Sequence, residues 1–162
     1  MKRIFVLCLL LCVAGSLFAL DVFIGFGAEA NGNTPHGTAA GFGWLFGLDL
    51  NRYFGLGIKT NISYDLDSLY NMEQSGLLRF YLPFNKQGLF LQAAAGSSIF
   101  FTDNKSNFYI LGCITAGARF TFKETFYVEP YVRGGYPFTW GCGLNAGFKF
   151  SENTSRREEN DD

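Results

Sequence analysis

The chain has 162 residues, a formal net charge of −1 and only 17% charged residues, a balance that excludes a basic nucleic-acid-binding stripe. Phenylalanine, with 19 residues, and glycine, with 20, are both abundant. Because no helical period accompanies them, this composition favours an all-β protein. After residue 19, no stretch is long and apolar enough for a membrane helix.

Residues 1–19 have the features of a secretory signal peptide. Residues 2–3 supply a positive start, residues 4–13 a short apolar core, and residues 16–19 a cleavage site with small residues. A lipoprotein anchor at Cys12 is the alternative, but the leucine before it is not the small residue that such an anchor needs. We therefore expect cleavage after the alanine that ends the signal.

Turn residues divide residues 20–150 into eight segments in which apolar and polar residues alternate. The asparagine, aspartate, glycine and proline residues between the segments are typical of hairpin loops. Each segment has about nine to fifteen residues, which is the length that a tilted strand needs to cross a hydrocarbon layer. The segments are Leu20–Ala30, Thr38–Leu50, Phe54–Leu66, Ser75–Pro83, Gly88–Thr102, Asn107–Phe122, Thr125–Gly135 and Thr139–Phe150.

The alternation separates large apolar side chains from glycine, polar and charged ones, and side-chain volume decides which set faces inward. An eight-stranded barrel has an interior just wide enough for its lining side chains, so Phe42, Trp44, Phe46 and Phe120 cannot all point into it. The bulky set then faces outward, where only lipid can cover it. We predict an all-β protein, an eight-stranded antiparallel up-and-down transmembrane β-barrel. A soluble β-sandwich with an aromatic core is the alternative.

Aromatic residues gather near the ends of the segments, as in the two aromatic girdles of a membrane barrel. The residues that we expect to form these girdles are Tyr53, Phe54, Phe120 and Phe122 at one rim and Tyr136, Phe138 and Trp140 at the other.

The signal, the eight segments and the final hairpin VEPYVRGGYPFTWGCGLNAGFKF resemble the small eight-stranded outer-membrane barrels of diderm bacteria, of the OmpA, OmpX and OmpW kind. The hairpin most resembles members from spirochaetes. The resemblance covers residues 1–150 and implies a place in the outer membrane. In these families, alternating residues on the last strand are the insertion signal that the barrel-assembly machinery recognises. The matching residues here are Leu144, Ala146, Phe148 and Phe150. Two departures are the polar residues 151–162 after the terminal aromatic and the missing larger outer loops.

Charged residues on the polar face are expected to form a network in the barrel lumen. Its members are Lys59, Arg79, Arg119, Glu129, Arg133 and Lys149, with Asp21, Glu29, Asp49 and Asp65 among the acids. If Phe122 pairs with Phe126, Arg119 lies opposite Glu129, although a register shifted by two residues stays open. The network either plugs the lumen or, as the resemblance suggests, gates a narrow pore. We favour the plug, because eight strands leave little bore, but abundant interior glycine would leave room for a small solute.

Candidate residues for other chemistry are few. Some barrels of this size are lipid-modifying enzymes, but His36 has no serine in its loop, and Glu29 faces inward. We therefore expect no catalytic site, and no metal or cofactor either, since a lone histidine lacks further ligands. Cys113 and Cys142 lie on opposite faces of the predicted strands, which argues against a disulfide.

An even number of strands places both termini in the periplasm, so the first, third, fifth and seventh connections face outward. The largest of these, Asp67 to Gln74, is small for a host-binding adhesin. Residues 151–162, with two arginines and five acids, are expected to be a disordered periplasmic tail.

We therefore expect a monomeric, non-enzymatic protein of the outer membrane with a structural role. A narrow channel for small or apolar solutes is an additional role that the sequence does not decide. Its expected partners are outer-membrane lipid and, during insertion, the barrel-assembly machinery; nucleic acid is not expected. One alternative is a surface interaction protein that acts through its outer loops. The other is a lipid-modifying enzyme that uses His36.

Overall fold

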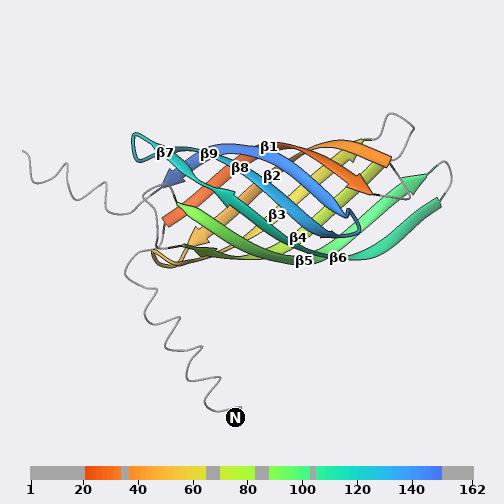
Figure 1. Cartoon of the computed structure of the whole chain (residues 1–162), viewed down its shortest axis with the longest axis horizontal. Coiled ribbons are helices and arrows are strands. Elements are labelled where there is room, and N and C mark those ends of the chain that lie inside the picture. Colours follow the sequence, from red (N-terminus) through yellow and green to blue (C-terminus); the bar gives the residue numbers. More distant parts are fainter. Residues whose placement is uncertain (1–20, 34–36, 65–69, 83–87, 103–104, 151–162) are drawn as a thin grey trace, which may run out of the picture.

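The computed structural model describes residues 21–33, 37–64, 70–82, 88–102 and 105–150. These residues form one antiparallel sheet that closes on itself into a barrel, drawn in Figure 1. No helix in these ranges is long and apolar enough to cross a membrane. The expected signal peptide, His36, Asp65 and the polar tail lie outside the described residues.

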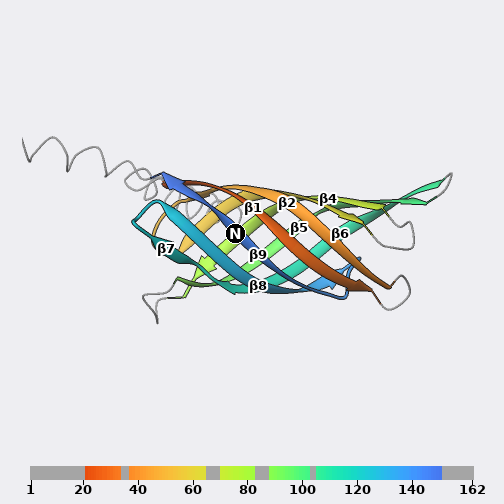
Figure 2. The same cartoon turned by 90° about the horizontal axis from the view of Figure 1, so that it is seen from above.

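Nine strand segments make up the eight walls of the barrel, which are strongly tilted in both views (Figures 1 and 2). Each strand pairs with the next one along the chain, except that β6 and β7 both pair with β8. β1 also pairs with β9, so the start of β1 and the end of β9 lie at the same end of the barrel. The predicted eight-stranded antiparallel up-and-down barrel is confirmed. The strands are β1 (Asp21–Asn33), β2 (Gly37–Asp49), β3 (Phe54–Tyr64), β4 (Tyr70–Tyr81), β5 (Leu89–Thr102), β6 (Lys105–Ala118), β7 (Phe120–Phe122), β8 (Phe126–Tyr136) and β9 (Trp140–Phe150).

β6 and β7 form a single wall with one interruption, at Arg119. Both segments pair with β8 in the same register, because Gly117 pairs with Tyr131 and Phe120 pairs with Val128. Pro130 lies opposite Ala118, the last residue of β6, with its carbonyl oxygen against Gly117. Since proline has no backbone N–H, the ladder lacks a donor at this point. The wall is therefore interrupted without any change of register, and the register that we expected from the Phe122–Phe126 pair is the one observed.

The fourth strand begins earlier than its sequence indicated. We expected a strand from Ser75 after a loop from Asp67 to Gln74, but β4 starts at Tyr70. The polar composition of Tyr70–Gln74 resembles a loop only because one face of this strand lines a polar interior. Asn71 and Glu73 are both buried, and both bind side chains from other strands.

Apolar side chains cover the outside of the barrel, and charged ones lie within it. Ile110 is 76% exposed and Trp44 is 41% exposed, whereas Arg79 and Glu129 are 1% and 0% exposed. This is the reverse of a water-soluble protein, in which charged groups face the solvent. Only a hydrocarbon layer removes so large an apolar surface from water, so the outward direction predicted for the bulky face is confirmed.

Inward aromatic rings fill the space that the interior glycines leave. A Cβ atom at Gly117 would lie 2.6 Å from the ring of Phe90, and one at Gly143 would lie 2.5 Å from the hydroxyl of Tyr131. Both glycines stand directly across the strand pair from the ring that covers them. At these positions, interior glycine leaves no free room for a solute, in contrast to what we expected; conduction by the barrel stays untested. Further examples are Phe23 over Gly47 and Tyr127 over Gly25.

Candidate functional site: the lumen of the barrel

The charged side chains of the lumen fall into two clusters. The terminal cluster lies toward the end where β1 begins and β9 ends, and it contains Asp21, Asp49, Arg79, Arg119, Glu129 and Lys149. The far cluster lies toward the opposite end, and it contains Glu29, Lys59, Glu73 and Arg133.

Glu129 is the centre of the terminal cluster. Its carboxylate accepts hydrogen bonds from Arg79 Nη1 at 2.7 Å and Nη2 at 3.3 Å, and from Arg119 Nε at 2.5 Å. The amide oxygen of Gln92 accepts two further bonds from Arg79. A single buried carboxylate thus holds two guanidinium groups from different walls of the barrel. Short, charge-assisted bonds of this kind are the strong class of protein hydrogen bonds.

Asp49 and the side chains around it balance the remaining charge of the terminal cluster. Asp49 Oδ2 lies 2.8 Å from Arg119 Nη1 and 3.8 Å from Lys149 Nζ, and Tyr81 donates a 2.8 Å hydrogen bond to Oδ1. Lys149 Nζ also lies 2.7 Å from Asp21. Three cationic groups therefore meet three carboxylates, so the cluster is formally neutral.

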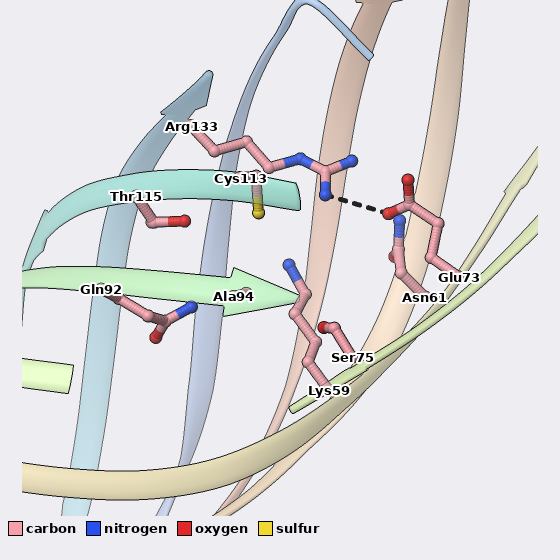
Figure 3. A pocket seen from close by; sticks show the side chains of 9 residues that line it. All are labelled: Lys59, Asn61, Glu73, Ser75, Gln92, Ala94, Cys113, Thr115 and Arg133. Carbon is pink, nitrogen blue, oxygen red and sulfur yellow. Dashed lines mark ion pairs between the residues drawn. The ribbon is translucent and has the colours of Figure 1, made fainter. Parts of the chain in front are cut away.

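The far cluster is also formally neutral, with two cations and two carboxylates. Glu29 lies 2.6 Å from Lys59 Nζ and 2.7 Å from Arg133 Nη2, and it accepts a 2.6 Å hydrogen bond from the Tyr131 hydroxyl. Arg133 Nη1 lies 2.9 Å from Glu73, the ion pair that is dashed in Figure 3. Arg133 thereby joins two acids from β1 and β4, one through each Nη atom of its planar guanidinium.

Aromatic faces cover the guanidinium groups of the terminal cluster. Arg79 lies 4.0 Å from the ring centroid of Phe90, and Arg119 lies 4.2 Å from that of Phe23 and 4.6 Å from that of Tyr127. Stacking of this kind attracts a cation even where water is excluded. It explains why large rings stand on the charged face of an otherwise alternating pattern.

Little space remains between the two clusters. Among the cavities lined by the described residues, two in the lumen have a volume of about 10 Å³ each, and Lys59, Gln92 and Thr115 line both of them. The first cavity is the one that Cys113 and Arg133 also line, and Figure 3 shows side chains from several strands pointing into it. Within the described part of the chain, Asn61 Oδ1 and Glu73 Oε1 beside it have no hydrogen-bond partner. A space of this size with free acceptors suits one water molecule and is too small for a solute.

An apolar layer closes the far end of the lumen. Ala39, Phe100 and Phe138 are buried together, and Tyr109 packs against them. Phe138 was expected in the outer aromatic girdle, and that prediction is wrong, because the side chain is only 4% exposed. The turn between β8 and β9, closed by a hydrogen bond from Gly135 N–H to Thr139 O, carries the ring back over the lumen, 5.8 Å from Arg133.

The structure places the other predicted residues as follows. All six of the predicted lumen residues lie inside, in one or the other cluster. Of the girdle residues, Phe120 is half-buried and the remaining ones are exposed, namely Tyr53, Phe54, Phe122, Tyr136 and Trp140. On the outward face of β9, Ala146 is half-buried and the others are exposed, namely Leu144, Phe148 and Phe150. Recognition of these last residues during assembly stays a prediction.

Sequence reasoning missed Glu73, a member of the far cluster, and Asn31, which binds to that cluster. Asn31 accepts hydrogen bonds from Arg133, and Glu73 pairs with the same guanidinium. Both residues lie beyond the strand boundaries drawn from composition. Continuing the period of two through outward Met72 would have placed Glu73 inside.

The described residues offer no group of three or more His, Cys, Asp or Glu side chains arranged to hold a metal ion. Cys113 and Cys142 are free thiols. Cys113 lines the first cavity, and Cys142 is exposed on the outer face. Their opposite faces agree with the sequence expectation.

No protein-family model and no curated protein matches the chain. Among solved structures, the N-terminal β-barrel domain of OprF from Pseudomonas aeruginosa is 19% identical, with a TM-score of 0.61 over 80% of this chain and 97% of that one. Neisserial surface protein A is 10% identical, with a TM-score of 0.53 over 80% and 95%. The outer-membrane protein OprG of Pseudomonas aeruginosa is 10% identical, with a TM-score of 0.52 over 82% and 96%. None of these supports the spirochaetal resemblance, but they do support the outer-membrane location. The chain therefore has the fold of the small eight-stranded outer-membrane barrels.

Proposed function

We propose that the chain is an integral outer-membrane protein with a structural role, whose lumen is a permanent plug in place of an open pore. The observation that carries this proposal is the filling of the lumen by two neutral ion clusters around cavities of only about 10 Å³. The narrow channel for small solutes is thereby disfavoured.

The energy needed to open a path supports the plug. A solute would have to separate at least one buried pair in each cluster, for example Arg79–Glu129 in one and Arg133–Glu29 in the other. Breaking a single buried ion pair by removing one partner typically costs about 3–5 kcal/mol. A state with one cluster open that lies this far above the closed state in free energy would have a population of roughly 1% or less. Conduction needs both clusters open, so a steady current is not expected.

The connections at the far end argue against a surface interaction protein. They have five residues or fewer between consecutive strands, at 34–36, 65–69, 103–104 and 137–139. A standard protein–protein interface takes about 20–30 residues from each side. The narrow rim of this barrel is small for that purpose, so adhesion has no specific observation in its favour.

Conductance in a planar lipid bilayer tests the plug directly. We expect the refolded protein to give no discrete channels at positive or negative voltage, and vesicles that contain it not to swell in small sugars. Glu129→Gln is the informative variant, and Glu124→Gln, on the exposed turn between β7 and β8, is its control. Discrete channels in the unchanged protein that respond to Glu129→Gln but not to Glu124→Gln would refute the proposal.

The lipid-modifying alternative depends on His36. We expect His36→Ala to leave the lipid composition of the outer membrane unchanged, because Glu29, the nearest acid along the chain, is engaged by Lys59, Tyr131 and Arg133 in the lumen. Mass spectrometry of lipids from cells with either protein decides this, and an altered acyl profile would restore the enzymatic alternative.

A further inference from the structure

One place on the outward face of the barrel departs from its apolar character. Away from the three residues at either end of each described strand, polar side chains face outward only at Thr60, Gln74 and Ser97. These three lie side by side on β3, β4 and β5, because Gln74 pairs with Thr60 on one side and Ser97 on the other. The adjacent row on β4, β5 and β6 is formed by Gly76, Ala95 and Gly112. We call these six residues the belt patch.

The polar side chains of the belt patch have no hydrogen-bond partners within the described part of the chain. Thr60 is only 6% exposed although it faces outward, and Gln74 is exposed. Among the described residues, none donates or accepts a side-chain hydrogen bond with Thr60, Gln74 or Ser97. In hydrocarbon no water replaces that partner, so an unpaired amide there is costly.

Nothing within a single barrel requires glycine at the two glycine positions of the belt patch. A Cβ atom at Gly76 or Gly112 would meet no other atom within 4 Å. By contrast, a Cβ at inward Gly96 would collide with the backbone of Gln74 and Ser75. Small residues on a membrane-facing surface let a second backbone approach closely. The patch is thus a shallow, flat area on a wall that otherwise carries bulky side chains. Those around it include Ile58, Met72, Leu78, Ile110 and Ile114.

The belt patch lies in the middle of the membrane-spanning wall. Gly76 is near the centre of β4, and Ala95 and Gly112 are near the centres of β5 and β6. The exposed aromatic residues Phe80, near the end of β4, and Phe101, near the end of β5, lie toward opposite ends of the barrel on the same side as the patch. A lipid headgroup would lie beyond those aromatic residues, and a lipid chain offers no hydrogen bond to an amide. The occupant must therefore bring polar groups into the hydrocarbon layer.

We propose that the belt patch is the contact surface for a second copy of this chain, related by a two-fold axis along the membrane normal. A primary amide carries both a donor and an acceptor, so Gln74 of one copy can pair with Gln74 of the other. A two-fold contact brings the same patch of each subunit together, as this pairing requires. A second copy also enters the membrane in the same orientation and places its amide at the same depth. The chain is then a dimer in the membrane, in place of the monomer expected from its sequence.

Crosslinking through matched cysteines tests the contact. Ala95 on β5 and Ala28 on β1 are both exposed, and β1 stands opposite β5 in the strand order of the barrel. Each is changed to cysteine in a Cys142→Ser background, and the protein in lipid vesicles is oxidised. Ala95→Cys is expected to give disulfide-linked dimers, and Ala28→Cys to give several-fold less. Equal yields from the two positions would overturn the proposal.

Association in vesicles tests the amide and the flat surface separately. Energy transfer between labelled copies is expected to show about tenfold weaker dimerisation for Gln74→Leu and for Gly76→Ile. Ala28→Ile adds comparable bulk on the opposite wall and is expected to leave dimerisation unchanged. Unaltered association in both patch variants would refute the proposal. Native mass spectrometry gives a second way to refute it. The proposal fails if the unchanged protein is a monomer that carries a lipid or another protein, and if Gln74→Leu releases that ligand. If a variant fails to insert, the cysteine pair still decides.

Discussion

Arg79 and Glu129 form a two-bond ion pair through the interior of the barrel, and they thereby join β4 to β8. The two residues are 50 positions apart in the chain, and neither strand is a neighbour of the other in the sheet. The same carboxylate also binds Arg119, so one acid holds together three walls. The backbone hydrogen bonds of the sheet, by contrast, join each strand only to its two neighbours. This pair is therefore a cross-brace between two strands that are not neighbours in the sheet.

Replacement of Glu129 by glutamine is expected to destabilise the barrel by roughly 3–5 kcal/mol, because two buried guanidinium groups lose their shared carboxylate. Urea unfolding in vesicles, followed by the fluorescence of Trp44 and Trp140, measures this loss. Glu124→Gln on the exposed turn is the control and is expected to change stability by less than about 0.5 kcal/mol. A similar small effect at Glu129 would show that the cross-brace contributes little.

Truncation of Phe138 to alanine is expected to open the far end of the lumen. The ring covers Arg133, and Cys113 lines the cavity beneath that arginine. In a Cys142→Ser background, we expect a charged thiol reagent added to the outside to label Cys113 roughly tenfold faster, because the ring suppresses local opening. Phe108→Ala removes an exposed outward ring at the same end and serves as the control. Equal labelling rates in the two variants would contradict the covering role of Phe138.

Two glycines on neighbouring strands are expected to respond differently to alanine. A Cβ at Gly96 would lie 2.6 Å from Ser75 Cα, a backbone atom that cannot move away, whereas Gly76 has open space. We expect Gly96→Ala to cost about 1–3 kcal/mol and to lower the yield of folded barrel. Gly76→Ala is expected to be neutral within about 0.5 kcal/mol. The shift of folded barrels on unheated gels reports the yield, and urea unfolding reports the stability. Equal tolerance at both sites would show that the strands separate easily.

The last strand carries a prediction that comes from the family resemblance. If its outward aromatic residues guide assembly, Phe150→Ser should reduce the amount of barrel in the outer membrane of cells severalfold. Phe122→Ser is well matched, since Phe150 is 55% exposed and Phe122 is 53% exposed near the same end. Refolding of both variants into pure lipid separates assembly from stability. Equal losses for the two variants in cells would remove the special role of Phe150.

Alternation and volume in the sequence were sufficient to assign the two faces of the barrel. The period of two predicted that Trp44 and Phe46 would face outward and that Arg119 and Arg133 would face inward, and the structure confirms this. The prediction succeeds because the face of a strand residue depends only on local backbone geometry and on which face lipid can cover. For the hairpin with Phe122 and Phe126, the two faces excluded a register shift of one residue but left a shift of two open, and the structure has the Phe122–Phe126 pair.

Boundaries and exceptions to the alternation were less predictable. The segment that contains Asn71 and Glu73 is as polar as a loop. The reason is that the inward face of a strand is polar in this lumen, whereas the inward face is apolar in a water-soluble protein. Phe138 is an aromatic residue near a strand end, as girdle residues are, but the turn before β9 directs its ring inward. Composition cannot separate these cases, since it does not report the direction of a side chain in a turn.

The amino-acid sequence by itself determined that this chain closes into a barrel with an apolar exterior and an ionic interior, because both properties follow from period and side-chain size. The Arg119–Glu129 pair on neighbouring walls agrees with the hairpin register drawn from the sequence, but only the tertiary structure decided which charges meet across the lumen. Arg79 reaches Glu129, and Arg133 reaches Glu29 and Glu73, through closure of the sheet between β1 and β9. Side-chain packing within the hairpins also places Phe23 and Phe90 over the glycines directly opposite them, which fills space that the sequence left open. The contacts between charges depend on the distance across the barrel, and no local pattern contains that distance.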